Sequence, residues 1–139
     1  MNFERSSGIL FHPTSLPSPY GIGTLGKEAF EFVDFLKKAS QKLWQVFPLG
    51  PTGYGDSPYQ CFSAFAGNPL LIDFDLLVNE NLLSKNAIAC TDTDEDKIDF
   101  GQLINLKIPV LKTSYENFLK ISSVIEHKKF ENFNQENHY

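Results

Sequence analysis

The segment GKEAFEFVDFLKKASQKLWQVFP, residues 26–48, contains the two patterns that decide the fold. In its first part, apolar residues recur at helical spacing, with Glu28 near the start and two lysines near the end, both favourable to the helix dipole. This pattern predicts a helix over residues 26–40, with Thr24 as its cap. In its second part, residues 43–47 form a β-favouring run that Pro48 ends, which predicts a strand with Trp44 in the core.

A second strand is predicted upstream, over the apolar residues 8–11, and its continuous apolar character is typical of a strand buried on both faces. Strand, helix and strand in this order form a βαβ unit with two parallel strands, so the predicted fold class is α/β. In such units the loops that leave the carboxyl ends of the strands build the binding site. Residues 12–15 and 50–69 are the two loops that qualify.

The remainder of the chain predicts mainly helices. A short helix is expected over residues 75–83, an acidic solvated connection over 84–99, and a longer helix over 102–126 that Pro109 should kink or divide. The last residues, 128–139, are polar and give no clear capping signal. Three carboxylates on or beside the short helix, Asp73, Asp75 and Glu80, are expected to be solvated rather than catalytic.

Composition excludes several classes of function. The net charge of −5 over 139 residues argues against a nucleic-acid partner, which would require clustered lysine and arginine. No segment reaches the length of a signal peptide or a membrane span, so no membrane partner is expected. Cys61 and Cys90 form neither a disulfide scaffold nor a pair at metal-ligand spacing, which indicates a reducing, cytoplasmic setting without a metal or other cofactor.

Residues 21–27, GIGTLGK, match the spacing of two phosphate-binding motifs. Three prolines separate the first glycine from the preceding strand, whereas a dinucleotide fingerprint follows its strand directly. Glu28 stands where a P-loop needs a serine or threonine hydroxyl for Mg²⁺. The segment is therefore predicted to be a glycine-bearing turn that enters a helix.

The loop GPTGYGDSPYQCFSAFAGNP, residues 50–69, carries the candidate site. Its prolines and glycines predict a single fixed shape, with Phe62, Phe65 and Ala64 as apolar anchors against the core. Aromatic faces beside hydrogen-bonding groups suit a carbohydrate better than a charged ligand. The side chains that would supply them are Tyr54, Tyr59, Asp56, Ser57, Gln60 and Asn68.

Alternative interpretations of these residues stay open at this stage. Tyr54 and Tyr59 could each be half-buried structural residues whose hydroxyls bond a nearby carbonyl, and Asp56 could form an Asx-type turn with its own backbone. His12, at the end of the first strand, could bond neighbouring backbone rather than a ligand.

Three ordered motifs, HPTSLPSPYGIG (12–23), WQVFPLGPTGYGDSPYQ (44–60) and FSAFAGNPLLID (62–73), resemble the N-terminal segment of amylomaltases, the bacterial 4-α-glucanotransferases also called disproportionating enzymes. The resemblance implies the N-terminal part of a (β/α)₈ TIM barrel with the start of an inserted helical subdomain. Residues 1–83 would then form the first βαβ unit with its glucan-binding loop. Residues 84–139 would form the acidic connection and a truncated segment of the helical subdomain.

The family resemblance also implies an activity and a set of binding residues. Amylomaltases transfer α-1,4-glucan chains between maltodextrins with retention, using one carboxylate as nucleophile and a second as acid and base. Tyr59 and Ser57 match residues that line the donor side of the glucan groove, Tyr54 matches an additional glucan contact, and Asp56 lies in the same motif. Around Ile104, where some relatives carry an aromatic side chain, this chain is aliphatic.

The carboxylates that catalyse the family's reaction lie in later barrel strands, and none of their motifs occurs in this chain. The catalytic residues are therefore expected downstream of Tyr139, the last residue of the sequence. The resemblance thus implies an N-terminal fragment that is inactive alone, with the remainder of the barrel as a continuing or separate chain. Two alternatives stay open, a maltodextrin-binding fragment without catalysis and a truncated gene product without an independent function.

Overall fold

The structure is a computed structural model that describes residues 4–53, 55–63, 65–88 and 97–138. These residues contain two strands, four α-helices and three short 3₁₀ turns, η1 to η3. In chain order the elements are β1 (Gly8–Leu10), η1 (Pro13–Ser15), α1 (Lys27–Lys38), β2 (Leu43–Gln45), η2 (Pro69–Leu71), α2 (Phe74–Asn79), η3 (Lys85–Ala87), α3 (Phe100–Ile121) and α4 (Val124–Glu136).

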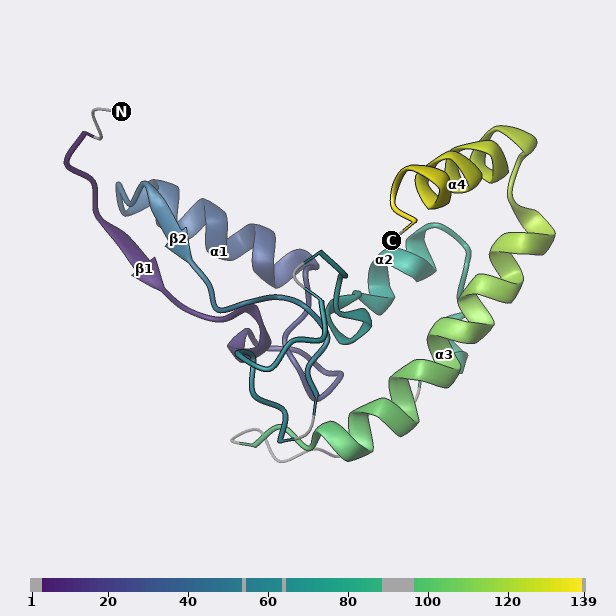
Figure 1. The fold of residues 1–139 in the computed structure, drawn as a ribbon, viewed down its shortest axis with the longest axis horizontal. Helices are drawn as coiled ribbons and strands as arrows, with labels where there is room; N and C mark the ends of the chain where they lie inside the picture. The colour runs from purple at the N-terminus through teal and green to yellow at the C-terminus, as the bar shows by residue number, and fades with distance from the viewer. Residues whose placement is uncertain (1–3, 54, 64, 89–96, 139) are drawn as a thin grey trace.

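The predicted βαβ unit is confirmed, because β1 and β2 are parallel neighbours with α1 between them in sequence (Figure 1). Gly8 lies opposite Leu43 and Leu10 opposite Gln45. The strands approach so closely at Gly8 that a Cβ there would overlap the Leu43 backbone. The fold class is therefore α/β, as the sequence predicts.

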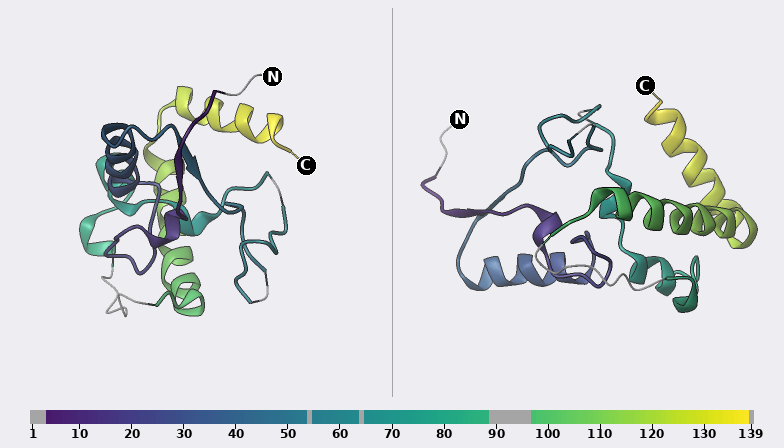
Figure 2. Two further views of the ribbon diagram at one scale, coloured as in Figure 1. Left: turned by 90° about the vertical axis from the view of Figure 1, so that its left-hand side faces the viewer. Right: turned by 90° about the horizontal axis from the view of Figure 1, so that it is seen from below.

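The prediction that the first strand is buried on both faces is wrong. Ile9 and Leu10 of β1 are 38% and 54% exposed, and Leu43 of β2 is 58% exposed. On one side, Phe32 of α1 packs against Phe11 and Trp44, with ring centroids 5.1 and 4.9 Å away. Figure 2 shows the 50–69 loop away from α1, on the other side of the strands. In the described part of the chain, α1 therefore shields only one face of the sheet.

The start of α1 differs from the prediction, since Gly26 and not Thr24 is its N-cap residue. The buried Thr24 hydroxyl instead donates to Asp73 Oδ2 at 2.6 Å, and Asp73 Oδ1 accepts the Leu76 N–H at 3.0 Å, which caps α2. Asp73 is only 5% exposed, so its predicted solvated position is wrong, whereas Asp75 and Glu80 are exposed as expected. A side chain at Gly26 would collide with the Asp73 carboxylate.

The two C-terminal helices answer two further predictions. Of the two effects expected of Pro109, division of the helix does not occur, because α3 is a single helix of 22 residues, and its Leu103 is buried against Ile22 and Leu70. Tertiary packing thus outweighs the loss of one backbone hydrogen bond. The polar end of the chain is also helical, because Ser123 and Glu126 form a capping box that starts α4.

Lys107 fixes α3 to the turn before α2. Its side chain is 1% exposed, its ammonium group donates to the Ile72 carbonyl at 3.0 Å, and it lies 4.6 Å from the centre of the Phe74 ring. Burial lowers the pKa of Lys107 from 10.5 to about 8, although the negative charge of Asp73 opposes the shift.

Stability should therefore depend on pH through Lys107. Between pH 8 and pH 10.5 the unfolded chain binds more protons at this residue than the folded chain does, so the free energy of unfolding rises with pH. From pH 7.5 to 9.5 we expect wild type to gain about 2 kcal/mol relative to Lys107→Met, measured by urea denaturation. Lys112→Met, a change of an exposed lysine on the same helix, should follow wild type. Equal pH dependence in wild type and Lys107→Met would contradict this assignment.

Candidate functional site

The loop of residues 50–69 follows the carboxyl end of β2 and folds back on itself as a short hairpin. Thr52 and Cys61 form an antiparallel bridge, and the Gly53 N–H donates to the Gln60 carbonyl at 3.2 Å. At the tip, Gly55 and Asp56 have φ values of 81° and 53°, the left-handed region that glycine and aspartate tolerate better than most residues. The loop therefore has a defined shape that its own backbone hydrogen bonds maintain.

The predicted aromatic anchors of the loop are wrong. Phe62 and Phe65 are 80% and 77% exposed, and Ala64 lies outside the described residues. The ring of Phe62 lies over Gly53, where an added Cβ would be 2.9 Å from it. Cys61 joins the two sides of the loop instead, because its thiol donates to the Pro58 carbonyl at 2.9 Å and lies 3.6 Å from the Gly50 carbonyl.

Tyr59 is exposed, with 73% of its surface accessible. Its ring centroid lies 5.5 Å from that of Phe47, with an angle of 55° between the ring planes. The Tyr59 N–H donates to Ser57 Oγ at 3.4 Å, and the Ser57 carbonyl accepts from the Gln60 N–H at 3.0 Å. The alternative of a half-buried structural tyrosine is therefore wrong for Tyr59.

Asp56 lies at the exposed tip of the hairpin. The Asx-type turn considered for it is wrong, because the residue two positions on is Pro58, which has no N–H to donate. The carboxylate accepts no hydrogen bond from any other described residue. Tyr54 lies outside the described residues. Asn68 caps η2 by accepting the Leu70 N–H at 2.9 Å, so its side-chain oxygen is already used in a structural contact.

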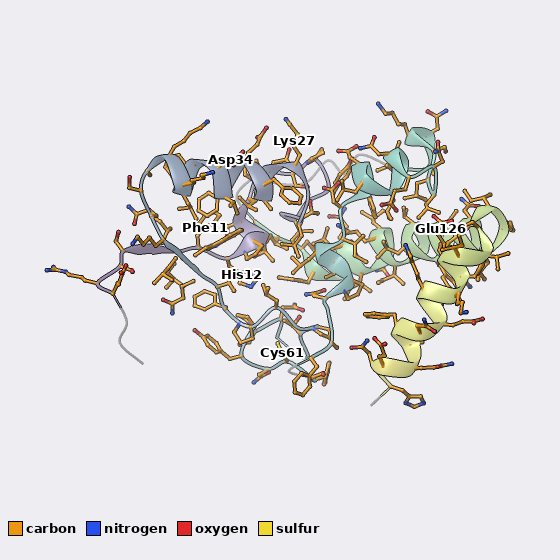
Figure 3. The ribbon with its side chains drawn as sticks, turned by 90° about the horizontal axis from the view of Figure 1, so that it is seen from above. Phe11, His12, Lys27, Asp34, Cys61 and Glu126 are labelled. Carbon is orange, nitrogen blue, oxygen red and sulfur yellow. The ribbon has the colours of Figure 1, made fainter. Side chains whose placement is uncertain are left out.

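His12 follows β1 and lies beside the same loop. Figure 3 shows it between Phe11 and Cys61. Its Nδ1 lies 2.8 Å from Thr14 Oγ1 and accepts the Thr14 N–H at 3.4 Å, so the local-backbone interpretation is confirmed. Burial lowers the pKa of His12, and the backbone carbonyl of Pro48 partly opposes this shift. The ring nitrogen Nε2 is buried and has no partner in hydrogen-bond geometry among the described residues. The ring stacks on Phe47, with centroids 5.8 Å apart.

Sequence reasoning missed Phe47, which it treated only as a strand residue. Phe47 lies two residues after the end of β2, and its ring contacts both His12 and Tyr59. Its position before Pro48, at the carboxyl end of a parallel strand, was the available signal. The rings of His12, Phe47 and Tyr59 thus connect residues 12–15 with residues 50–69, the two loops expected to form the binding site.

The arrangement suits recognition more than bond cleavage. An exposed aromatic ring offers an apolar surface, and the neighbouring Ser57 and Asp56 offer polar atoms. The described residues contain no cluster of three histidine, cysteine, aspartate or glutamate side chains placed to hold a metal ion. None of the described helices has the length and apolar character needed to cross a membrane.

Besides Tyr54 and Ala64, two further residues named in the sequence predictions lie outside the described residues. Tyr139, after which the catalytic carboxylates are expected, lies outside the described residues, and so does Cys90. The described part of the chain ends at His138, two positions after the last residue of α4. The position of the catalytic carboxylates downstream of Tyr139 therefore stays a prediction.

A family model described as 4-alpha-glucanotransferase matches residues 11–139. The chain is 47% identical over 135 residues to a 4-alpha-glucanotransferase from Thermus thermophilus. This alignment covers 97% of this chain and 26% of that protein. A 4-alpha-glucanotransferase from Clostridium butyricum is 54% identical over 109 residues, covering 77% of this chain and 22% of that protein. The chain thus spans about a quarter of the length of these relatives.

A solved structure of a related protein also matches this chain. The structure of an amylomaltase from Streptococcus agalactiae in complex with acarbose matches with a TM-score of 0.88 and 47% identity, covering 96% of this chain and 27% of that one. Both the sequence and the arrangement of its elements therefore agree with those of this group of proteins.

Proposed function

Since the chain belongs to the 4-α-glucanotransferase family, we propose that it is the N-terminal part of an enzyme that transfers α-1,4-glucan chains between maltodextrins. In this proposal it contributes to a (β/α)₈ barrel and contains the start of an inserted helical subdomain. Residues 1–83 are the first βαβ unit and residues 84–139 the acidic connection and subdomain segment. The exposed apolar residues of the strands support the barrel, because further strands and helices would cover them.

The binding role assigned to the loop rests on one observation above all, the exposed ring of Tyr59 beside the carboxyl ends of two parallel strands. Tyr59 and Ser57 line the donor side of a glucan groove, with Asp56 beside them and Tyr54 at an additional glucan contact. A glucose ring has an apolar face that packs on an aromatic side chain and hydroxyls that bond polar neighbours. The solved relative that resembles this chain was determined with acarbose.

The proposed reaction needs two carboxylates, a nucleophile that forms a glycosyl intermediate and an acid that then acts as base. A sugar hydroxyl takes the place of water in the second step. These carboxylates belong to barrel strands downstream of Tyr139, so the chain alone has no transferase activity. Maltodextrins are its proposed ligands, the rest of the barrel is its proposed partner, and the cytoplasmic setting stays a prediction.

A second candidate is a maltodextrin-binding fragment without catalysis. The observation that favours it is an exposed recognition loop in a chain that lacks the family's catalytic motifs. Mixing the chain with the unmatched segment of a relative separates the two candidates, because only the first predicts transferase activity in the mixture. A truncated product without any function would bind no glucan.

The direct test is calorimetric titration of the chain with maltoheptaose. We expect binding that Tyr59→Ala weakens about tenfold, because covering one face of an aromatic ring contributes roughly half of the 1.5–3 kcal/mol of a fully buried apolar side chain. Tyr115→Ala is the matched control, since Tyr115 is 47% exposed and rests on Phe130 outside the loop. If wild type fails to bind, or if both variants weaken binding equally, the proposed role of the loop is wrong.

A further inference from the structure

Phe47 lies between a fixed ring and an exposed one. On one side it stacks with His12 at 5.8 Å and an interplanar angle of 23°, and on the other it meets Tyr59 at 5.5 Å. His12 is held in turn by two contacts with Thr14 in the turn after β1. The three rings therefore form a continuous series from the end of β1 to the exposed loop.

Tyr59 has few other restraints. Its backbone N–H reaches Ser57 Oγ, but its hydroxyl bonds no other described residue. Among the described residues, Phe47 supplies the aromatic contact to its ring. An exposed tyrosine without such a contact would sample several rotamers and lose that freedom on binding, which weakens the binding.

We propose that Phe47 is a positioning residue, which holds the Tyr59 ring in place so that its exposed side can receive the apolar face of an α-linked glucose unit. This inference rests on the proposed function of the loop. Phe47 acts through Tyr59 and does not touch the sugar itself. His12 sets the position of Phe47 by stacking on its other side.

The test is a double-mutant cycle in the full chain, with maltoheptaose as the titrated ligand. Phe47→Leu should weaken binding about threefold to tenfold, and Phe47→Tyr, which keeps the ring, should restore wild-type binding. In the Tyr59→Ala background, Phe47→Leu should have no further effect, because the ring it positions is gone. Phe32→Leu is the matched control, since Phe32 also packs among aromatic rings, those of Phe11, Phe35 and Trp44, but lies on α1, away from the loop.

Each other outcome overturns a defined part of the account. If Phe47→Leu binds as wild type does, weakens binding equally in both backgrounds, or loses its native circular dichroism spectrum, Phe47 is not a positioning residue. If Phe32→Leu weakens binding as much, the effect reflects the packing of the domain. If wild type binds no maltoheptaose, the proposed function fails and this inference fails with it, which distinguishes that result from the others.

Discussion

Replacing Asp73 with alanine is expected to lower the free energy of unfolding by about 3 kcal/mol or more. Asp73 accepts hydrogen bonds from the Thr24 hydroxyl and the Leu76 N–H. Its removal costs about 1 kcal/mol for the cap of α2 and about 1–3 kcal/mol for the buried Thr24 hydroxyl, which loses its acceptor. The buried charge of Lys107 also loses the carboxylate that opposes its pKa shift.

The comparison with Asp75→Ala makes the Asp73 prediction specific. Asp75 lies in the first turn of the same helix and is exposed, so its removal should change the free energy of unfolding by no more than about 0.5 kcal/mol. Urea denaturation of wild type and both variants gives the two values. An Asp73→Ala variant as stable as Asp75→Ala would show that the buried carboxylate does not join the starts of α1 and α2.

The same contacts argue against a phosphate site at GIGTLGK. The carboxylate of Asp73 lies against Gly26, at the N-terminus of α1, where a bound anion would be placed. The chain supplies this negative charge itself, from 47 residues further along the sequence. The glycine at position 26 serves the close approach of that carboxylate.

The second large effect concerns association with the part of the relatives that this chain does not match. Apolar residues of β1 and β2 are exposed on one face of the two-stranded sheet. The outer edges of the two strands pair with no other strand in the described part of the chain. We expect the chain to form a stable one-to-one complex with the segment of the Thermus thermophilus relative that it does not match, measured by analytical ultracentrifugation. Ile9→Lys should weaken this complex because it puts a charge on a strand that becomes buried.

A control on the outer surface distinguishes that complex from nonspecific association. Val124→Lys changes a residue that is 86% exposed at the start of α4, far along the chain from the strands, and should leave the complex intact. If the two variants behave alike, the strands are not the docking surface.

Local patterns predicted the parts of the fold that depend on neighbouring residues. The helical spacing of residues 29–39 and the β-favouring run after it gave α1 and β2 within a few positions. Contacts between distant residues could not be read in this way. Thr24 was expected to cap its own helix, but its partner is 49 residues away. The capping box at Ser123 and Glu126 was readable from its spacing, and its signal was outweighed by the polar composition around it.

The candidate site shows the same division. Turn-forming residues correctly predicted that the loop turns back on itself. Aromatic and polar side chains predicted a sugar ligand, which stays a prediction. Sequence reasoning assigned Phe62 and Phe65 to the core because aromatic residues are usually buried, yet both are exposed. The role of Phe47 depends on the meeting of two loops, which only the folded chain shows.

The most direct test of the central claim is glucose release from maltotriose. The claim is that this chain supplies one wall of a glucan groove but not the carboxylates that break the bond. The chain alone should release no glucose, and the complementary segment alone should release none. Mixing them should produce glucose and longer maltodextrins, and Tyr59→Ala should lower that rate about tenfold or more. Turnover by the chain alone, or no turnover by a mixture that forms the complex, would contradict the account.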